Sequence, residues 1–495
     1  MRFRKSVFHD DERSYQLEVE LLQESSRGDL RLEQYLDQRR IDEKYRYLYR
    51  AFYLFEVFRP LFSDLKLRIY NNLSYIFELE GKVSAEEAFK IVEIELGFLY
   101  DLLYTKIPIV TTRTGVFLRF ICLSFTSSTL IAFVFIVGMH RYSKSKVDIG
   151  ISYLLMVGAI FLEIYSDVLH LGSDRGILWL ADQDNKVFKA IGSRAVHFTK
   201  PKKGIQSMAQ HSLLDYCLHP RKLKLAAILN KFDSDDNTEK YLQTTWKEYT
   251  VLSELLNERG LKVLEHAEID QDFGWSVSKV EFTHSLLLWH IATEVVYNDD
   301  HQRFRAGKLG SNCRISKLLS DYMMYLLFLC PAMLPEGIGN IRHQDTCIEA
   351  KNFFHNKMDN KQVIRALYGI DIESRSLFVQ MGSMRKSAFF EGCQIAVQLQ
   401  NLLDQFRWDH EEKWEVIANV WLDMLCYAAA QCLWKEHAKQ LQHGEELLTH
   451  VALLMAHLGL SNKIEMAPLF GRLKDVDFKP SFYWNRLDRL ASYLA

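Results

Sequence analysis

The longest uncharged stretch of the chain, from Phe120 to Met139, constrains the fold more than any other feature. Its twenty residues carry no charge, and eleven of them are Leu, Ile, Phe or Val. A helix of that length is about 30 Å long, which matches the thickness of a bilayer's hydrocarbon core. The stretch therefore predicts a membrane-spanning helix in a chain of 495 residues whose other parts are polar enough for water.

A second apolar run follows after a short polar loop. Ile149 to Leu162 is free of charge over 14 residues. Together the two runs predict a transmembrane hairpin within residues 107–171, with helices at about 117–139 and 148–170. The alternative is a pair of helices buried in a soluble core, but few core helices contain twenty uncharged residues in a row.

Two acidic residues interrupt the second run, Glu163 and Asp167. A carboxylate at membrane depth is costly, so such residues usually have a function. Glu163 and Asp167 are therefore a candidate intramembrane polar site, on a transport path for example. The simpler alternative is that they are interfacial carboxylates.

The basic residues around the hairpin predict its orientation. Residues 186–231 contain ten Lys and Arg and one acid, whereas the connecting loop offers only Arg141, Lys144 and Lys146. The positive-inside rule then places both the N-terminal and the C-terminal regions in the cytosol. The organelle is not indicated by the sequence.

Three lysines of this basic region are candidates for contact with anionic lipid headgroups. They are Lys200, Lys202 and Lys203. A solvated linker explains the same composition equally well.

Outside the hairpin the chain reads as mainly α, with only 8 Pro and 23 Gly. We expect a charged helical N-terminal region at 1–106, a basic juxtamembrane region with an acidic loop at 172–240, and a helical C-terminal domain at 241–495. The stretch 171–207 should be irregular, and Phe232 to Glu239 should be the acidic loop. Apolar periodicity predicts helices at about 85–104, 315–330, 420–433 and 447–458. The eight cysteines form no CxxC pair and are expected to be reduced thiols.

No motif in the chain indicates a known chemistry. HExxH, GxxxxGK[ST] and GxSxG are all missing from the sequence. We therefore predict no catalytic, cofactor-binding or metal-binding residue. An enzyme acting on lipid remains a weaker alternative, which would require His290, Glu294, His437 and His450 to converge on one solvent-reachable cleft. A net charge of −2 gives no reason to expect nucleic-acid binding.

Several stretches of the chain together resemble a known family. They are 92–106, 207–220, 287–297, 315–335 and 420–460. The chain is similar to the plant membrane proteins of unknown function numbered 4220, which carry the domain of unknown function 594 at the C-terminus, here about 280–465. The resemblance implies a multi-pass membrane protein with a cytosolic helical C-terminal region and supplies no catalytic residue. Members usually begin with additional membrane helices, whereas this chain starts in the charged region after them. A truncated gene model or a short isoform is therefore an open alternative.

The sequence favours a membrane-anchored interaction or scaffold protein whose partners are the lipid bilayer and other proteins. A transporter or channel component using Glu163 and Asp167 is the first alternative, and two spans would have to oligomerise to line a path. The sequence determines neither the oligomeric state nor the identity of a partner.

Overall fold

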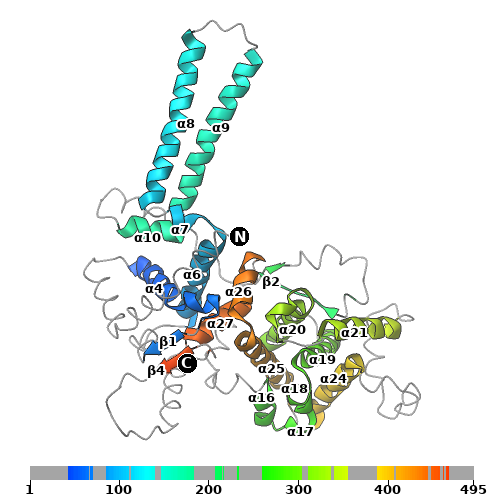
Figure 1. Ribbon diagram of the computed structural model, residues 1–495. Helices are drawn as coiled ribbons and strands as arrows, with labels where there is room; N and C mark the ends of the chain where they lie inside the picture. The colour runs from blue at the N-terminus through cyan, green and yellow to red at the C-terminus, as the bar shows by residue number, and fades with distance from the viewer. Residues whose placement is uncertain are drawn as a thin grey trace, which may run out of the picture. The chain divides into compact units, whose positions relative to one another are not determined.

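The computed structural model shows a mainly α-helical protein, as the sequence predicts (Figure 1). Its chain divides into two compact units, of which one holds 1–29, 60–89 and 205–495 and the other holds 30–59 and 90–204. The predicted domain boundaries at 106, 171 and 240 stay a prediction. The residues that the structure describes are 43–65, 67–70, 85–110, 113–139, 146–182, 207–213, 216, 231–233, 259–303, 310–335, 339–354, 387–405, 408–443, 447–457, 461 and 464–467.

Two long helices, α8 (Arg113–Met139) and α9 (Lys146–Leu171), form the predicted hairpin and lie side by side in Figure 1. Gly115–Val137 and Val147–Leu171 are each long and apolar enough to cross a membrane. Their large apolar side chains point outward, and Leu154, for example, is 73% exposed. Such a surface is stable only in an apolar solvent, so the hairpin fits a bilayer.

A small helical body adjoins the hairpin within the same unit. It consists of α4 (Glu43–Phe58), the part of α6 (Ala85–Tyr104) from residue 90 onward, α7 (Ile107–Val110) and α10 (Asp174–Asp182). Phe52 meets Phe98 edge to face at 5.3 Å between ring centroids, and the guanidinium of Arg175 lies 5.5 Å from the Phe52 centroid. Aromatic and cation–π packing therefore joins α4, α6 and α10.

Helix α10 corrects one expectation, because the stretch after residue 171 is not irregular throughout. The turn from α9 into α10 is tight, since a Cβ atom on Gly176 would lie 2.2 Å from the carbonyl oxygen of His170. Only glycine fits there. Ile177 and Leu180 then bury an apolar face, which holds this short amphipathic helix in place.

The other unit contains a helical core built around α19 (Phe282–Arg303). Helix α19 packs against α20 (Ser311–Leu329) and α24 (Ala388–Gln405), while α25 (His410–Gln431) packs against α20 and α27 (Leu447–His457). Further helices are α16 (Leu261–His266), α17 (Asp270–Phe273), α18 (Trp275–Ser278), η2 (Pro331–Met333), α21 (Gly339–Phe354), α26 (Trp434–Gln440) and η5 (Leu441–His443).

Burial on every side explains why α19 shows little amphipathic pattern in its sequence. All residues from Phe282 to Val296 are buried, including polar ones. The polar side chains find partners inside the core: the indole of Trp421 donates to Thr293 Oγ1 at 3.0 Å, for instance. Buried polar groups that are bonded in this way cost little.

The helices predicted from periodicity are confirmed. Helix α6 ends at Tyr104, and α20 ends just before Pro331, which cannot continue it. Taken as one bent element, α25 and α26 also have the length and composition of a span, with a bend of 105°. However, α25 buries Lys413 and Asp423 against neighbouring helices, so we assign it to the core.

Among the described residues, four short strands form two small sheets. Strand β1 (Leu67–Tyr70) pairs in parallel with β4 (Ile464–Ala467), and β2 (Ser207–Ala209) pairs antiparallel with β3 (Lys231–Asp233). The start of the expected acidic loop is therefore wrong, because Phe232 and Asp233 belong to β3. Sequence periodicity cannot detect three-residue strands whose partners lie far along the chain.

Candidate functional site

The predicted intramembrane carboxylates both contact α8 rather than standing alone. Asp167 forms an ion pair with Arg119, and both terminal nitrogens of Arg119 lie 3.3 Å from Ser166 Oγ. Arg119 is four residues from the start of one span and Asp167 four residues from the end of the other. The pair therefore lies near one end of the hairpin, where its charges neutralise each other.

Glu163 lies one helical turn before Asp167 and contacts Thr126. The hydroxyl of Thr126 is 3.2 Å from Glu163 Oε2 and 3.0 Å from the carbonyl oxygens of Cys122 and Leu123. Glu163 and Asp167 thus face the helix–helix contact, and a role in transport stays a prediction. Lys200, Lys202 and Lys203 lie outside the described residues.

Hydroxyl side chains along α8 bond to their own helix. Ser124 and Ser128 donate to carbonyl oxygens one turn earlier at 2.7 Å, and Thr129 donates to the Thr126 carbonyl at 2.7 Å. These bonds satisfy polar groups that would otherwise be unpaired in lipid.

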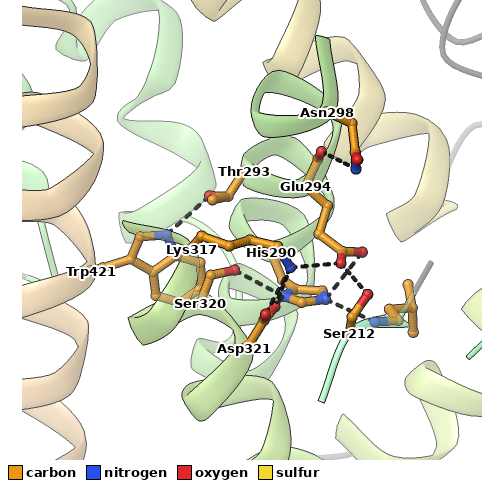
Figure 2. Close-up of polar contacts among 10 residues, drawn as sticks. Ser212, His290, Thr293, Glu294, Asn298, Lys317, Ser320, Asp321 and Trp421 are labelled. Carbon is orange, nitrogen blue, oxygen red and sulfur yellow. Dashed lines mark hydrogen bonds and ion pairs between the residues drawn. The ribbon is translucent and has the colours of Figure 1, made fainter. Parts of the chain in front are cut away.

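A buried polar cluster lies between α19 and α20 in the other unit (Figure 2). His290 and Glu294 are one turn apart on α19, and Lys317 and Asp321 are one turn apart on α20. The ammonium of Lys317 lies 2.6 Å from Asp321 Oδ1 and 3.0 Å from Glu294 Oε1. Burial alone would lower the pKa of Lys317, but the two carboxylates outweigh it and raise the pKa, so the lysine is charged.

The imidazole of His290 is held in one tautomer. Its Nε2 accepts a hydrogen bond from the backbone N–H of Leu213 at 3.1 Å, so Nε2 carries no proton. Its Nδ1 therefore carries the proton and donates it to Ser320 Oγ at 2.8 Å. His290 is thus neutral in this arrangement.

A short segment closes the cluster from one side, and we call residues 211–213 and 216 the strap. Ser212 Oγ donates to Glu294, and the backbone N–H of His211 donates to the Asp321 carbonyl at 3.0 Å. The His211 ring stacks on Phe328 at 4.8 Å, and Leu213 is fully buried. The strap is therefore an integrated part of this unit.

The cluster has a spacing that could hold a metal ion. One atom each from His290, Glu294 and Asp321 lie within 4.8 Å of one another. Lys317, however, already places its ammonium between the two carboxylates, and both ring nitrogens of His290 are engaged. The lysine supplies the positive charge that a metal would bring.

The four side chains required by the lipid-enzyme alternative do not line an open cleft. His290, Glu294, His437 and His450 are all buried. His437 Nδ1 contacts Thr449 Oγ1 at 3.0 Å, and burial lowers the pKa of His437 to about 4. This arrangement is typical of packed core histidines.

The sequence places His290 and Glu294 in one set of candidate residues, which does not include Lys317, Asp321 or Ser212. The i,i+4 spacing of Lys317 and Asp321 was a usable signal for one further pair. The contact of Ser212 with Glu294 joins residues 82 apart and has no local signal.

A second buried ionic group lies between α19, α24 and α25. Asp300 Oδ2 accepts from Lys413 Nζ at 2.8 Å and from the indole of Trp414 at 2.9 Å. Gln400 donates to both Asp299 and Asp300 and accepts from Lys413. Burial lowers the pKa of Lys413, and Asp300 opposes this effect.

Comparison with known families adds to this geometry. Residues 3–217 match the family described as a domain of unknown function, DUF4220, and residues 407–460 match the family described as a protein of unknown function, DUF594. Two separate parts of the chain thus match these two families. The DUF4220 part contains the hairpin and ends just after the strap, while the DUF594 part covers α25 to α27. No curated protein and no solved structure matches the chain.

Proposed function

We propose that this DUF4220–DUF594 protein is a membrane-anchored scaffold whose helical C-terminal part binds other proteins in the cytosol. One observation carries the proposal: among the residues that the structure describes, the apolar windows of α8 and α9 are not buried. Lipid is the solvent that suits two such helices. The basic residues after the hairpin support the cytosolic side for both termini.

The packing of the C-terminal helices supports binding rather than catalysis. In the part of the chain that the structure describes, His290, Glu294, Lys413 and His437 are buried and engaged in internal hydrogen bonds or ion pairs. Side chains held in this way stabilise a rigid body and are not available to a substrate.

Membrane anchoring is tested by fractionation. A detergent-free extract is washed with alkaline carbonate and centrifuged, and the full chain should stay in the membrane pellet. A matched variant, Leu154→Arg with Leu155→Arg, should pellet less, since each arginine costs about 2.5–3.5 kcal/mol near the centre of a span. Wild-type protein in the supernatant would overturn the proposal.

Sidedness is tested with a glycosylation acceptor inserted between residues 139 and 146. The proposed orientation puts this loop on the side opposite to both termini, so the acceptor should receive sugar in a microsomal assay. An acceptor added at the C-terminus should stay unmodified. The reverse pattern would invert the orientation.

The binding role is tested by proximity labelling with the full chain and with a chimera that carries an unrelated hairpin. If the C-terminal helices bind the partners, both chains should label the same proteins when they are directed to the same membrane. Loss of the shared set in the chimera would place recognition in α8 and α9 instead.

The contact of Glu163 with Thr126 keeps a transporter component as a second candidate. Two carboxylates, Glu163 and Asp167, lie along one helix–helix contact. An ion flux in reconstituted vesicles that disappears in Glu163→Gln would favour this function. An unchanged flux would remove it.

A further inference from the structure

We propose that His290 is a proton-operated latch: one proton on Nε2 breaks its hydrogen bond to Leu213 and loosens the strap from α19 and α20. The inference goes beyond the scaffold function and does not depend on membrane anchoring. It rests on the contacts of one nitrogen atom in the buried cluster (Figure 2).

The Nε2 atom of His290 has a single lone pair, and two groups of the described residues lie close to it. Leu213 N–H donates to it at 3.1 Å, and Glu294 Oε2 lies 3.5 Å away on the same helix. In the neutral ring, Nε2 and Oε2 are two acceptors facing each other. A proton on Nε2 turns that repulsive approach into an N–H···O bond to Glu294.

The same proton removes the acceptor of the Leu213 amide. Leu213 is fully buried, so its N–H has no access to water at that position. An unpaired buried N–H is costly, and moving the strap outward to reach water relieves the cost. Proton uptake by His290 and docking of the strap are therefore mutually exclusive in the observed geometry.

The charges that face His290 favour proton uptake. Helix α19 contributes Glu294, helix α20 contributes Lys317 and Asp321, and the strap contributes the neutral side chain of Ser212. Among the described residues, the groups that face neutral His290 are two carboxylates and one ammonium, a net charge of −1. A proton on the ring brings this charge to zero, which offsets the lost Leu213 bond.

The strap contains a second titratable group, His211, and the test must distinguish protonation of His211 from protonation of His290. His211 stacks on Phe328, and its backbone N–H bonds to the Asp321 carbonyl. The bond between Leu213 and His290 does not involve the His211 ring, so replacing that ring should leave the latch in place.

Hydrogen exchange with mass spectrometry on the full chain in detergent tests the latch. Exchange of the peptide that contains Leu213 is measured at about pH 7.5 and about pH 5.5 and corrected for intrinsic rates. Wild-type protein should lose protection about tenfold or more on acidification, in line with a lost buried hydrogen bond. His290→Gln should show no such loss, because its amide oxygen accepts from Leu213 and does not titrate. His211→Gln should retain the wild-type response.

Two results would overturn the latch. The first is equal protection of the Leu213 peptide at both pH values in the wild type. The second is an equal loss in peptides from α25, which would mean general unfolding instead of strap release. If His290→Gln does not fold, Glu294→Gln replaces it: the response should move to lower pH because the protonated ring loses its carboxylate partner, and an unmoved response contradicts the proposal.

Discussion

Asp300 and Lys413 form a fully buried ion pair that ties α19 to α25, with Lys413 Nζ 2.8 Å from Asp300 Oδ2. Trp414 and Gln400 donate to the same carboxylate, which therefore accepts three hydrogen bonds. The pair joins the last turns of α19 to the first turn of α25. It therefore holds the start of the DUF594 part against α19.

Replacing Lys413 with Met should destabilise the protein by about 3–5 kcal/mol, because Asp300 would then be a buried charge without its cation. The measurement is the free energy of unfolding by denaturant. Lys439→Met is the matched control, since Lys439 pairs with Glu436 at 2.6 Å on the surface and should contribute less than about 1 kcal/mol. The double variant Asp300→Asn with Lys413→Met should be more stable than Lys413→Met alone. A double variant that is no better would contradict an electrostatic cause.

The ion pair of Arg119 and Asp167 should stabilise the hairpin. Arg119→Gln leaves Asp167 without its cation at membrane depth and should cost about 1.5–3 kcal/mol. Thermal unfolding of a fluorescent fusion in detergent reports the change. Arg119→Gln combined with Asp167→Asn should recover part of the lost stability. Equal losses in the single and the double variant would show that the two residues are not energetically coupled.

Close packing of α19 and α24 depends on Gly392. A Cβ atom there would lie 2.7 Å from Ile291 Cβ, which is within a fully buried side chain. Gly392→Ala should therefore destabilise the core by about 1–3 kcal/mol. Gly158→Ala on α9 is the control, since nothing lies within 4 Å of its added methyl group, and its unfolding midpoint should match the wild type. Equal effects would refute the packing argument.

Buried histidines should make stability fall in acid. Burial lowers the pKa of His437 to about 4, against 6.5 for an unperturbed histidine. Below about pH 6.5 the unfolded chain takes up a proton that the folded chain refuses until about pH 4. Stability is thus complete above about pH 6.5 and decreases by about 3 kcal/mol for this residue as the pH falls to about 4.

This effect differs from the latch because it acts on global unfolding. His437→Gln should flatten the dependence of the unfolding free energy on pH while the acid response of the strap persists. A variant with the same pH slope as the wild type would show that His437 is not the cause. His450 contributes in the same direction, since burial lowers its pKa to about 3.

The hairpin and the main helices could be predicted from the sequence because their signals are local. A run without charge between Phe120 and Met139 is enough to define a span, and the proline at 331 is enough to end α20. The short helix α10 was missed, since its turn depends on the absence of a side chain at Gly176 rather than on periodicity. Strand β3 was missed because its partner is distant.

The buried polar groups could be predicted only in part. Partners on one helix, such as His290 and Glu294, are visible as an i,i+4 pair. The partners of Asp300 lie 100 and more residues away, and nothing near Lys413 in the sequence marks it as buried. Lysine is among the residues least often found inside proteins, so a rule based on residue type predicts that Lys413 is exposed.

The internal bonds of Ser124, Ser128 and Thr129 have a consequence for biogenesis. Since their hydroxyl protons already go to carbonyl oxygens of the same helix, these three side chains need no partner on another helix in an apolar solvent. Their hydroxyl groups should therefore add little to the free energy of moving α8 from the translocon into lipid.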